Sequence, residues 1–249
     1  MPAVFTDPVR AYRQGLLARP GERAFQVVVE QTDLFILAER DLGREIAAFV
    51  SGVRRELSTY VLLHPDFRES LSPVAVRDDA PAVARDMAEA AARFGVGPFA
   101  AVAGAFAQAV ADAFADASPN IVVENGGDIF LRSTRERTVA LLARPVEGAR
   151  LALAFTPERL PAAVCASSAT VGHSLSLGEA DMVTVAADRG AVADAAATAL
   201  GNMLRARADL EAMLAAAQAM EGRGVRGVFA QIGDLVGVAG DVELVAIEG

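Results

Sequence analysis

The 249-residue chain contains no tryptophan and a single cysteine, Cys165. One cysteine cannot form an internal disulfide, and no residue near it completes a spacing typical of metal ligands. Because Cys165 lies within an apolar stretch, we interpret it as a buried structural thiol rather than a nucleophile. The scarcity of cysteine therefore excludes a disulfide-stabilised scaffold and a cysteine-based metal site.

The chain also lacks a basic stripe, and its formal net charge is −9. A nucleic-acid partner is not expected, because phosphate binding requires clustered basic side chains. The N-terminal sequence lacks the basic start and the apolar core that are typical of a signal peptide. The longest apolar stretch, residues 97–117, carries Gln108, Asp112 and Asp116 on one helix face, which argues against a membrane span. We therefore expect a cytoplasmic protein that has no membrane partner.

What the chain has in abundance is hydrophobic residues, which make up 53% of the sequence and include many alanines. This composition can bury a sizeable core and predicts closely packed helices rather than bulky aromatic layers. The length suits a single domain over residues 1–249, or two intimately packed subdomains. Alanine-rich helices at the surface would also suit a homodimer.

Predicted strands and helices follow one another in blocks rather than in strict alternation, which favours an α+β fold. Short turns between successive strands predict a mostly antiparallel sheet. Strands are expected at 24–30, 32–39, 120–123, 129–132, 138–143, 150–155 and 180–187, with short strands after residue 225. Helices are expected at 41–57, 80–94, 97–117 and 191–207, the last extending or restarting through 219. A loop is expected at 60–73, which contains proline breakers, and another at 162–173, which is rich in Gly, Ser and Thr.

The first candidate site is the glycine-rich start of the alanine-rich helix, GVGPFAAVAGAFAQ at 95–108. Free N–H groups at a helix start attract anions, and small residues such as Gly97 and Gly104 let a phosphate or flat ring approach. The alternative is that glycine and alanine only allow this helix to cross another closely. On their own, these residues favour the packing interpretation.

The second candidate is the segment VCASSATVGHSLS, residues 164–176. Its polar side chains are Ser167, Ser168, Thr170, His173, Ser174 and Ser176. Hydroxyls and flexible backbone amides suit a phosphate-binding or polar-ligand loop, and a polar surface loop explains them equally well. A hydrolase would pair His173 with Ser168 or Ser174. That hypothesis is the weakest, because GxSxG is absent and no acid is placed to orient the histidine.

The third candidate is the helix RGAVADAAATALGNML at 189–204, in which Asp194 and Thr198 are four residues apart. Their oxygens therefore emerge from one helix face, among small apolar neighbours. A carboxylate in such surroundings requires a partner, and Mg²⁺ accepts a carboxylate, a hydroxyl and ligand phosphates. The alternatives are that Asp194 caps its own helix or is exposed near the helix start.

The fourth candidate is ENGGDIF at 124–130, which follows the apolar run 121–123. Asn-Gly between two strands predicts a type I′ hairpin turn, because both residues tolerate positive φ. Gly127 adds room for a ligand near the backbone, and Glu124 and Asp128 flank the turn. The residues alone favour a hairpin without a ligand-binding role.

The order of these motifs resembles the ApbE superfamily, whose characterised members are FAD:protein FMN transferases. The chain is most similar to an uncharacterised ApbE-like family whose marks are ENGGDIF, ASSATVGHSLSLG, ADMVTV and ADAAATALGN. The resemblance covers residues 25–210, and the order of the motifs is more specific than any one of them.

The resemblance implies an α+β ApbE-like fold with a cleft between sheet turns and helix N-termini, where FAD or FMN and Mg²⁺ would bind. Asp194 and Thr198 match the metal-binding helix, with a third ligand from a backbone carbonyl near residues 97–100. The glycine turn of the cleft matches Asn125, Gly126, Gly127 and Asp128, and His173 matches a site histidine. We expect ligand contacts also from Gly97, Gly104, Ser167, Ser168 and Thr170, and catalytic roles for Asp194 and His173.

Transferase members of the superfamily attack the FAD pyrophosphate with a Ser or Thr of an acceptor protein, release AMP and leave FMN attached. The resemblance therefore implies a Mg²⁺-dependent enzyme that acts on FAD or another nucleotide pyrophosphate. The alternative is a flavin- or nucleotide-binding protein without catalytic activity.

Overall fold

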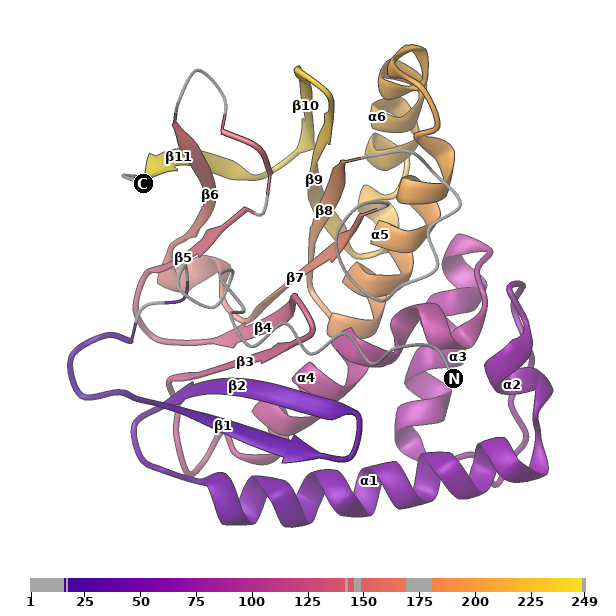
Figure 1. Cartoon of the computed structure of the whole chain (residues 1–249), viewed down its shortest axis with the longest axis vertical. Helices are drawn as coiled ribbons and strands as arrows, with labels where there is room; N and C mark the ends of the chain where they lie inside the picture. Colours follow the sequence, from indigo (N-terminus) through magenta and orange to yellow (C-terminus); the bar gives the residue numbers. More distant parts are fainter. Residues whose placement is uncertain (1–15, 17, 142, 146–148, 169–180, 248–249) are drawn as a thin grey trace.

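The structure is a computed structural model that describes residues 16, 18–141, 143–145, 149–168 and 181–247. An eight-stranded sheet forms its centre, and every pair of neighbouring strands in it is antiparallel (Figure 1). Its strands, in spatial order, are β1 (Arg23–Val29), β2 (Thr32–Ala38), β3 (Ile121–Asn125), β4 (Asp128–Arg132), β7 (Ala162–Ser167), β8 (Met182–Ala187), β9 (Val225–Ile232) and β10 (Leu235–Gly240).

A second, smaller antiparallel sheet has the order β11 (Glu243–Ile247), β6 (Arg150–Phe155) and β5 (Arg137–Ala140). The helices are α1 (Gly43–Leu63), α2 (Asp66–Glu69), α3 (Ala82–Phe94), α4 (Val102–Ala113), α5 (Gly190–Met203) and α6 (Leu210–Gln218). Short 3₁₀ segments lie at Pro98–Ala101, Pro157–Arg159, Arg207–Asp209 and Glu221–Arg223. The mixture of helices and antiparallel sheets confirms the expected α+β class.

Two hydrophobic cores lie on opposite faces of the large sheet. One core joins that sheet to the helices and contains Ile36, Met87 and Phe130. The other joins it to the small sheet and contains Leu131, Leu153 and Phe229. Phe130 and Leu131 are adjacent in β4 and belong to different cores, because successive side chains of a strand point to opposite faces. The molecule therefore has a helical layer, a central sheet and a small outer sheet.

Most expected elements are present, with shifted ends. The helix expected at 41–57 continues to Leu63 and ends before His64-Pro65, because the residue preceding a proline disfavours helical geometry. Part of the loop expected at 60–73 is therefore helical, and α2 follows it. The helix expected at 191–207 ends at Met203, and α6 is the predicted restart.

Two further expectations need correction. The alanine-rich helix expected at 97–117 begins as the 3₁₀ segment Pro98–Ala101 and becomes α-helical only from Val102 to Ala113. The loop expected at 162–173 is wrong for its first part, because Ala162–Ser167 is strand β7 in the interior of the large sheet. Its small residues have weak strand propensity, and both faces of the strand are covered by packed layers.

No single helix in the described part of the chain has the length and apolar character to cross a membrane. The helices Ala82–Phe94 and Pro98–Ala113 meet those criteria only as a pair, and their axes are bent by 104°.

Candidate functional site

The ENGGDIF segment forms the two-residue hairpin between β3 and β4. Gly126 and Gly127 have φ values of 68° and 106°, as a type I′ turn requires. Asn125 pairs with Asp128, so Gly-Gly rather than the expected Asn-Gly occupies the centre of the turn. This shift leaves Asn125 as the last residue of β3, and its Nδ2 donates to the backbone oxygen of Ala103 at 3.1 Å. The hairpin is thereby fastened to the start of α4.

Helices α4 and α5 cross beside this hairpin at two glycines. A Cβ on Gly104 would lie 2.3 Å from the backbone oxygen of Gly190, and a Cβ on Gly190 would lie 2.0 Å from that of Gly104. Gln108 accepts a hydrogen bond from the Gly190 N–H at 2.7 Å through its Oε1. These contacts support the packing interpretation of the glycine-rich helix start.

Gly97 is also small because the chain itself approaches it. A Cβ there would lie 1.9 Å from the backbone oxygen of Ser70. The space beside Gly97 is therefore occupied by the segment that follows α2. Ligand contacts from Gly97 and Gly104 stay predictions, and neither is needed to explain why the residue is glycine.

Asp194 lies in α5 and faces the start of α4. Its Oδ2 accepts a hydrogen bond from the backbone N–H of Gly104 at 2.9 Å. The residue before α5 is Arg189, and the helix start has no side-chain cap. Asp194 therefore does not cap its own helix, and it connects α5 to α4 instead. Thr198 follows one turn later and is, like Asp194, partly exposed.

Asp128 and Cys165 join this carboxylate from the central sheet. The pairing of Ile129 with Val164, extended by one residue, brings Asp128 opposite Cys165. Asp128 Oδ1 accepts the Ala166 N–H at 3.1 Å, and the Cys165 thiol donates to the Gly190 backbone oxygen at 3.7 Å. A carboxyl group, a thiol and Asp194 are thereby gathered beneath the α4–α5 crossing.

Burial controls the protonation of this cluster. It raises the pKa of Asp128 to about 7, with a further increase from Glu124, against hydrogen bonds from Ala166 and Cys165. Burial and then the charge of Asp128 raise the pKa of Asp194 well above its ordinary value. Burial, followed by the charges of Asp128 and Asp194, also raises the pKa of the Cys165 thiol. Each acid thus disfavours ionisation of the others.

Among the described residues, no basic side chain forms an ion pair with Asp128 or Asp194. Nor does this part of the chain contain three or more His, Cys, Asp or Glu side chains grouped to hold a metal. A cation at Asp194 would therefore need oxygen ligands of other kinds. Mg²⁺ suits such a site, because it binds one or two carboxylates and takes waters and phosphates as its other ligands.

The remaining predicted residues have different surroundings. Ser167 lies under α5, since a Cβ on Gly201 would be 2.9 Å from its Oγ. Ser168 donates to the Asp181 backbone oxygen at 2.6 Å, which joins the two ends of the intervening segment. Thr170, His173 and Ser174 lie outside the described residues, so their predicted roles stay predictions.

Sequence reasoning left the role of Asp128 open and did not connect Cys165 to the site. Both side chains lie on the side of their strands that faces the helices. For Asp128, the alternation of side chains along the predicted strand 129–132 indicates this side. For Cys165 the sequence gives no such indication, because its segment is expected to be a loop. The cluster therefore could not be recognised without the β4–β7 register.

Solved structures with this architecture include flavin transferases. The flavin transferase ApbE from Vibrio cholerae aligns with 90% of this chain and 96% of its own, at a TM-score of 0.57 and 14% identity. The ApbE protein from Thermotoga maritima aligns with 88% of this chain and 97% of its own, at a TM-score of 0.56 and 12% identity. The fold is therefore ApbE-like.

Sequence comparison is more specific. A family model described as AbpE bacteria matches residues 16–235. The UPF0280 protein of Methanocaldococcus jannaschii is 39% identical over 224 residues, covering 87% of this chain and 90% of that protein. The UPF0280 protein of Methanopyrus kandleri is 37% identical with the same coverage of each chain. The chain belongs to this ApbE-like family.

Proposed function

We propose that this protein binds FAD, or a related nucleotide pyrophosphate, together with Mg²⁺ beside Asp194 and transfers FMN to a protein hydroxyl. The observation that carries the proposal is the position of Asp194. Its carboxylate lies where α5 meets the start of α4 and the glycine hairpin, close to the acid Asp128. The fold shared with flavin transferases supports the same assignment.

The charges of the site suit a cation. Asp194 and Asp128 oppose one another's ionisation, and no basic side chain of the described residues pairs with either. A divalent cation would relieve that repulsion and allow Asp194 to ionise near neutral pH. Asp194 and Thr198 would hold the ion, which would supply charge neutralisation at the phosphoryl oxygens.

The chain's own residues would hold and orient the pyrophosphate. The Gly104 N–H fixes one oxygen of Asp194, and Asn125 fixes the hairpin against α4. In the reaction, an acceptor Ser or Thr oxygen forms a bond to the phosphorus of the FMN half. The bond from that phosphorus to the bridging oxygen breaks, and AMP leaves. His173 is proposed to take the hydroxyl proton.

The test compares wild type with Asp194→Asn, which keeps the size of the side chain and removes its charge. FAD binding is measured by calorimetry with and without Mg²⁺, and AMP release is followed by chromatography with a Ser/Thr-containing acceptor. We expect Asp194→Asn to weaken Mg²⁺-dependent binding by more than about tenfold and to abolish AMP release. Asp79→Asn, at an exposed position before α3, serves as the matched control and should match wild type.

The outcomes separate the hypotheses. Equal Mg²⁺-dependent binding by wild type and Asp194→Asn would contradict the assignment of Asp194. Tight FAD binding by wild type without AMP release would favour the alternative, a flavin- or nucleotide-binding protein without catalysis. Thermal unfolding without ligand checks folding, and we expect no loss of stability in Asp194→Asn, because ionisation of Asp194 is unfavourable in the free protein.

A further inference from the structure

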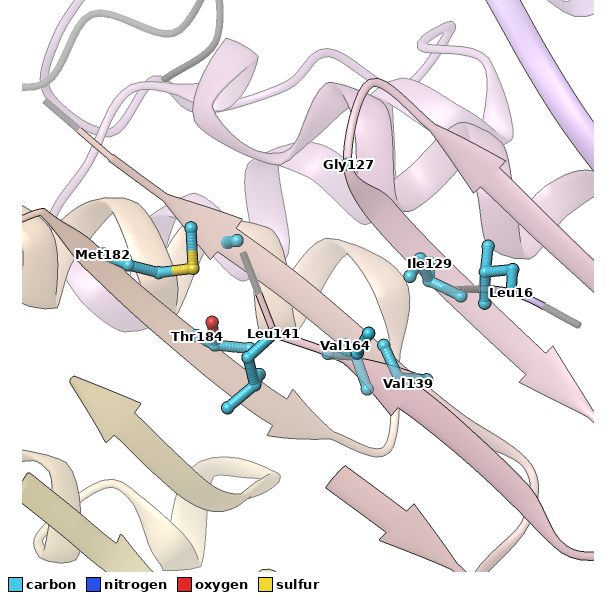
Figure 2. Close-up of a pocket in the computed structure, with 10 residues that line it drawn as sticks. Leu16, Gly127, Ile129, Val139, Leu141, Val164, Met182 and Thr184 are labelled. Carbon is cyan, nitrogen blue, oxygen red and sulfur yellow. The ribbon is translucent and has the colours of Figure 1, made fainter. Parts of the chain in front are cut away.

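A cavity of about 30 Å³ lies between the large sheet and the small sheet (Figure 2). Most of its wall is apolar, and its lining includes Ile129, Val139, Leu141, Val164 and Met182. Gly127, at the turn of the β3–β4 hairpin, also borders it. The cavity is therefore on the face of the sheet opposite to Asp128 and Cys165, at the same hairpin.

One polar side chain, Thr184, points into this apolar space from β8 (Figure 2). Thr184 is 2% exposed, and its Oγ1 has no hydrogen-bond partner among the described residues. Buried hydroxyls are normally paired, because losing hydrogen bonds to water without replacement is costly. Thr32, another buried threonine, follows this rule, since its Oγ1 accepts from Arg54 at 2.6 Å.

The hairpin turn connects the two faces. A Cβ built on Gly126 or Gly127 would meet no atom of the described residues within 4 Å, so these residues leave the space above the turn open. Asn125 and Asp128 flank the turn and face the helices, whereas Gly127 borders the cavity. The turn therefore lies between the helical face, which carries Asp194, and the cavity, and a ligand that occupied both would pass over it.

We propose that the cavity receives the edge of the nucleotide's planar ring, and that Thr184 donates a hydrogen bond to a ring nitrogen or carbonyl. The proposal rests on the proposed function and extends it to a specificity-determining residue. The cavity has room for about two water molecules, since each needs roughly 10–15 Å³. It suits the edge of a ring, whose insertion would give Thr184 a partner, while apolar walls would contact the ring faces.

The test uses Thr184→Val, which keeps the shape of the side chain and removes the hydroxyl. In the presence of Mg²⁺, binding of FAD, riboflavin, AMP and inorganic pyrophosphate is measured by calorimetry. We expect about tenfold weaker binding of FAD and of one ring compound, riboflavin or AMP, which identifies the ring. Pyrophosphate, which has no ring, should bind equally to both proteins.

Thermal unfolding without ligand gives an independent readout. Thr184→Val should raise the melting temperature or leave it unchanged, because the hydroxyl has no partner among the described residues to lose. Thr32→Val is the matched control and should lower it, because Nη1 of Arg54 loses the acceptor that Thr32 provides. A decrease in Thr184→Val as large as in Thr32→Val would show that an ordered water already satisfies Thr184, and would overturn the inference.

Two binding results distinguish the inference from the proposed function. If FAD binds wild type and Thr184→Val equally while Asp194→Asn weakens it, the ring assignment is wrong and the proposed function stands. If neither FAD nor pyrophosphate binds to wild type with Mg²⁺, both are wrong.

Discussion

The two candidate sites, on opposite faces of the central sheet, pair their buried polar groups to different extents. On the face toward the helices, Asp128 accepts a backbone N–H, Cys165 donates to a backbone oxygen, and Asn125 donates to Ala103. On the face toward the small sheet, Thr184 is buried in an apolar wall and has no partner within the described residues.

The comparison separates two kinds of site. On the helical face, Gly104 and Gly190 bring the backbones of α4 and α5 close to each other, and Gly201 lets α5 approach Ser167 of the sheet. Asp128 and Asp194 are hydrogen-bonded there, but no basic side chain of the described residues forms an ion pair with either. The cavity on the other face offers a small apolar space and the hydroxyl of Thr184, which has no partner among the described residues. A nucleotide with a charged pyrophosphate and a flat ring complements both faces.

The largest effect is expected from adding a methyl group where α4 and α5 cross at Gly104 and Gly190, on the helical face. Gly190→Ala places a methyl group where the Gly104 backbone oxygen lies, and we expect a loss of about 3 kcal/mol or more in the free energy of unfolding. Gly52→Ala, at an open position in α1, should instead stabilise by about 0.5–1 kcal/mol. Urea unfolding measures both. A Gly190→Ala protein as stable as wild type would show that the two helices separate easily.

A second effect concerns the acids of the same face. The folded-state pKa of Asp128 is raised to about 7 from 3.8, so the folded protein holds its proton longer than the unfolded chain does. Stability should therefore fall as pH rises through this window, by about 2–3 kcal/mol between roughly pH 5 and pH 8 without metal. Asp128→Asn should reduce that slope, as measured by urea unfolding at several pH values.

The control for this prediction is Asp79→Asn, which should keep the wild-type slope. In Asp128→Asn, the free energy of unfolding should still decrease somewhat as pH rises, because Asp194 also has a raised pKa. Stability that increases over the same range in wild type would contradict the direction assigned to these carboxyls.

The smallest effect is expected at Cys165, which is 1% exposed and whose pKa is raised by burial and by the two acids. Iodoacetamide should label it at least about a hundredfold more slowly in the native protein than after denaturation, because the thiolate is the reacting form. Mass spectrometry provides the measurement. Rapid labelling of native protein would indicate that the helices move away from the sheet and expose Cys165. The interpretation of Cys165 as a buried structural thiol would then be wrong.

Much of the fold was predictable because its signals are local. The amphipathic period of α1, the paired strands β1 and β2, and the glycine hairpin each follow from residues close together in the chain. The resemblance located Asp194 in a helix, and the structure shows what that residue contacts. Strand β7 was missed because small residues carry little strand propensity, and its pairing depends on distant neighbours.

The sequence by itself determined the α+β class, the family resemblance, the hairpin at ENGGDIF and the presence of an acid in an apolar helix. Those properties depend on spacing along the chain. The tertiary structure alone decided that Asp128, Cys165 and Asp194 share one side of the sheet, and that Thr184 is buried on the other without a partner in the described chain. Strand register and helix crossing set these arrangements, because they join residues that are far apart in sequence.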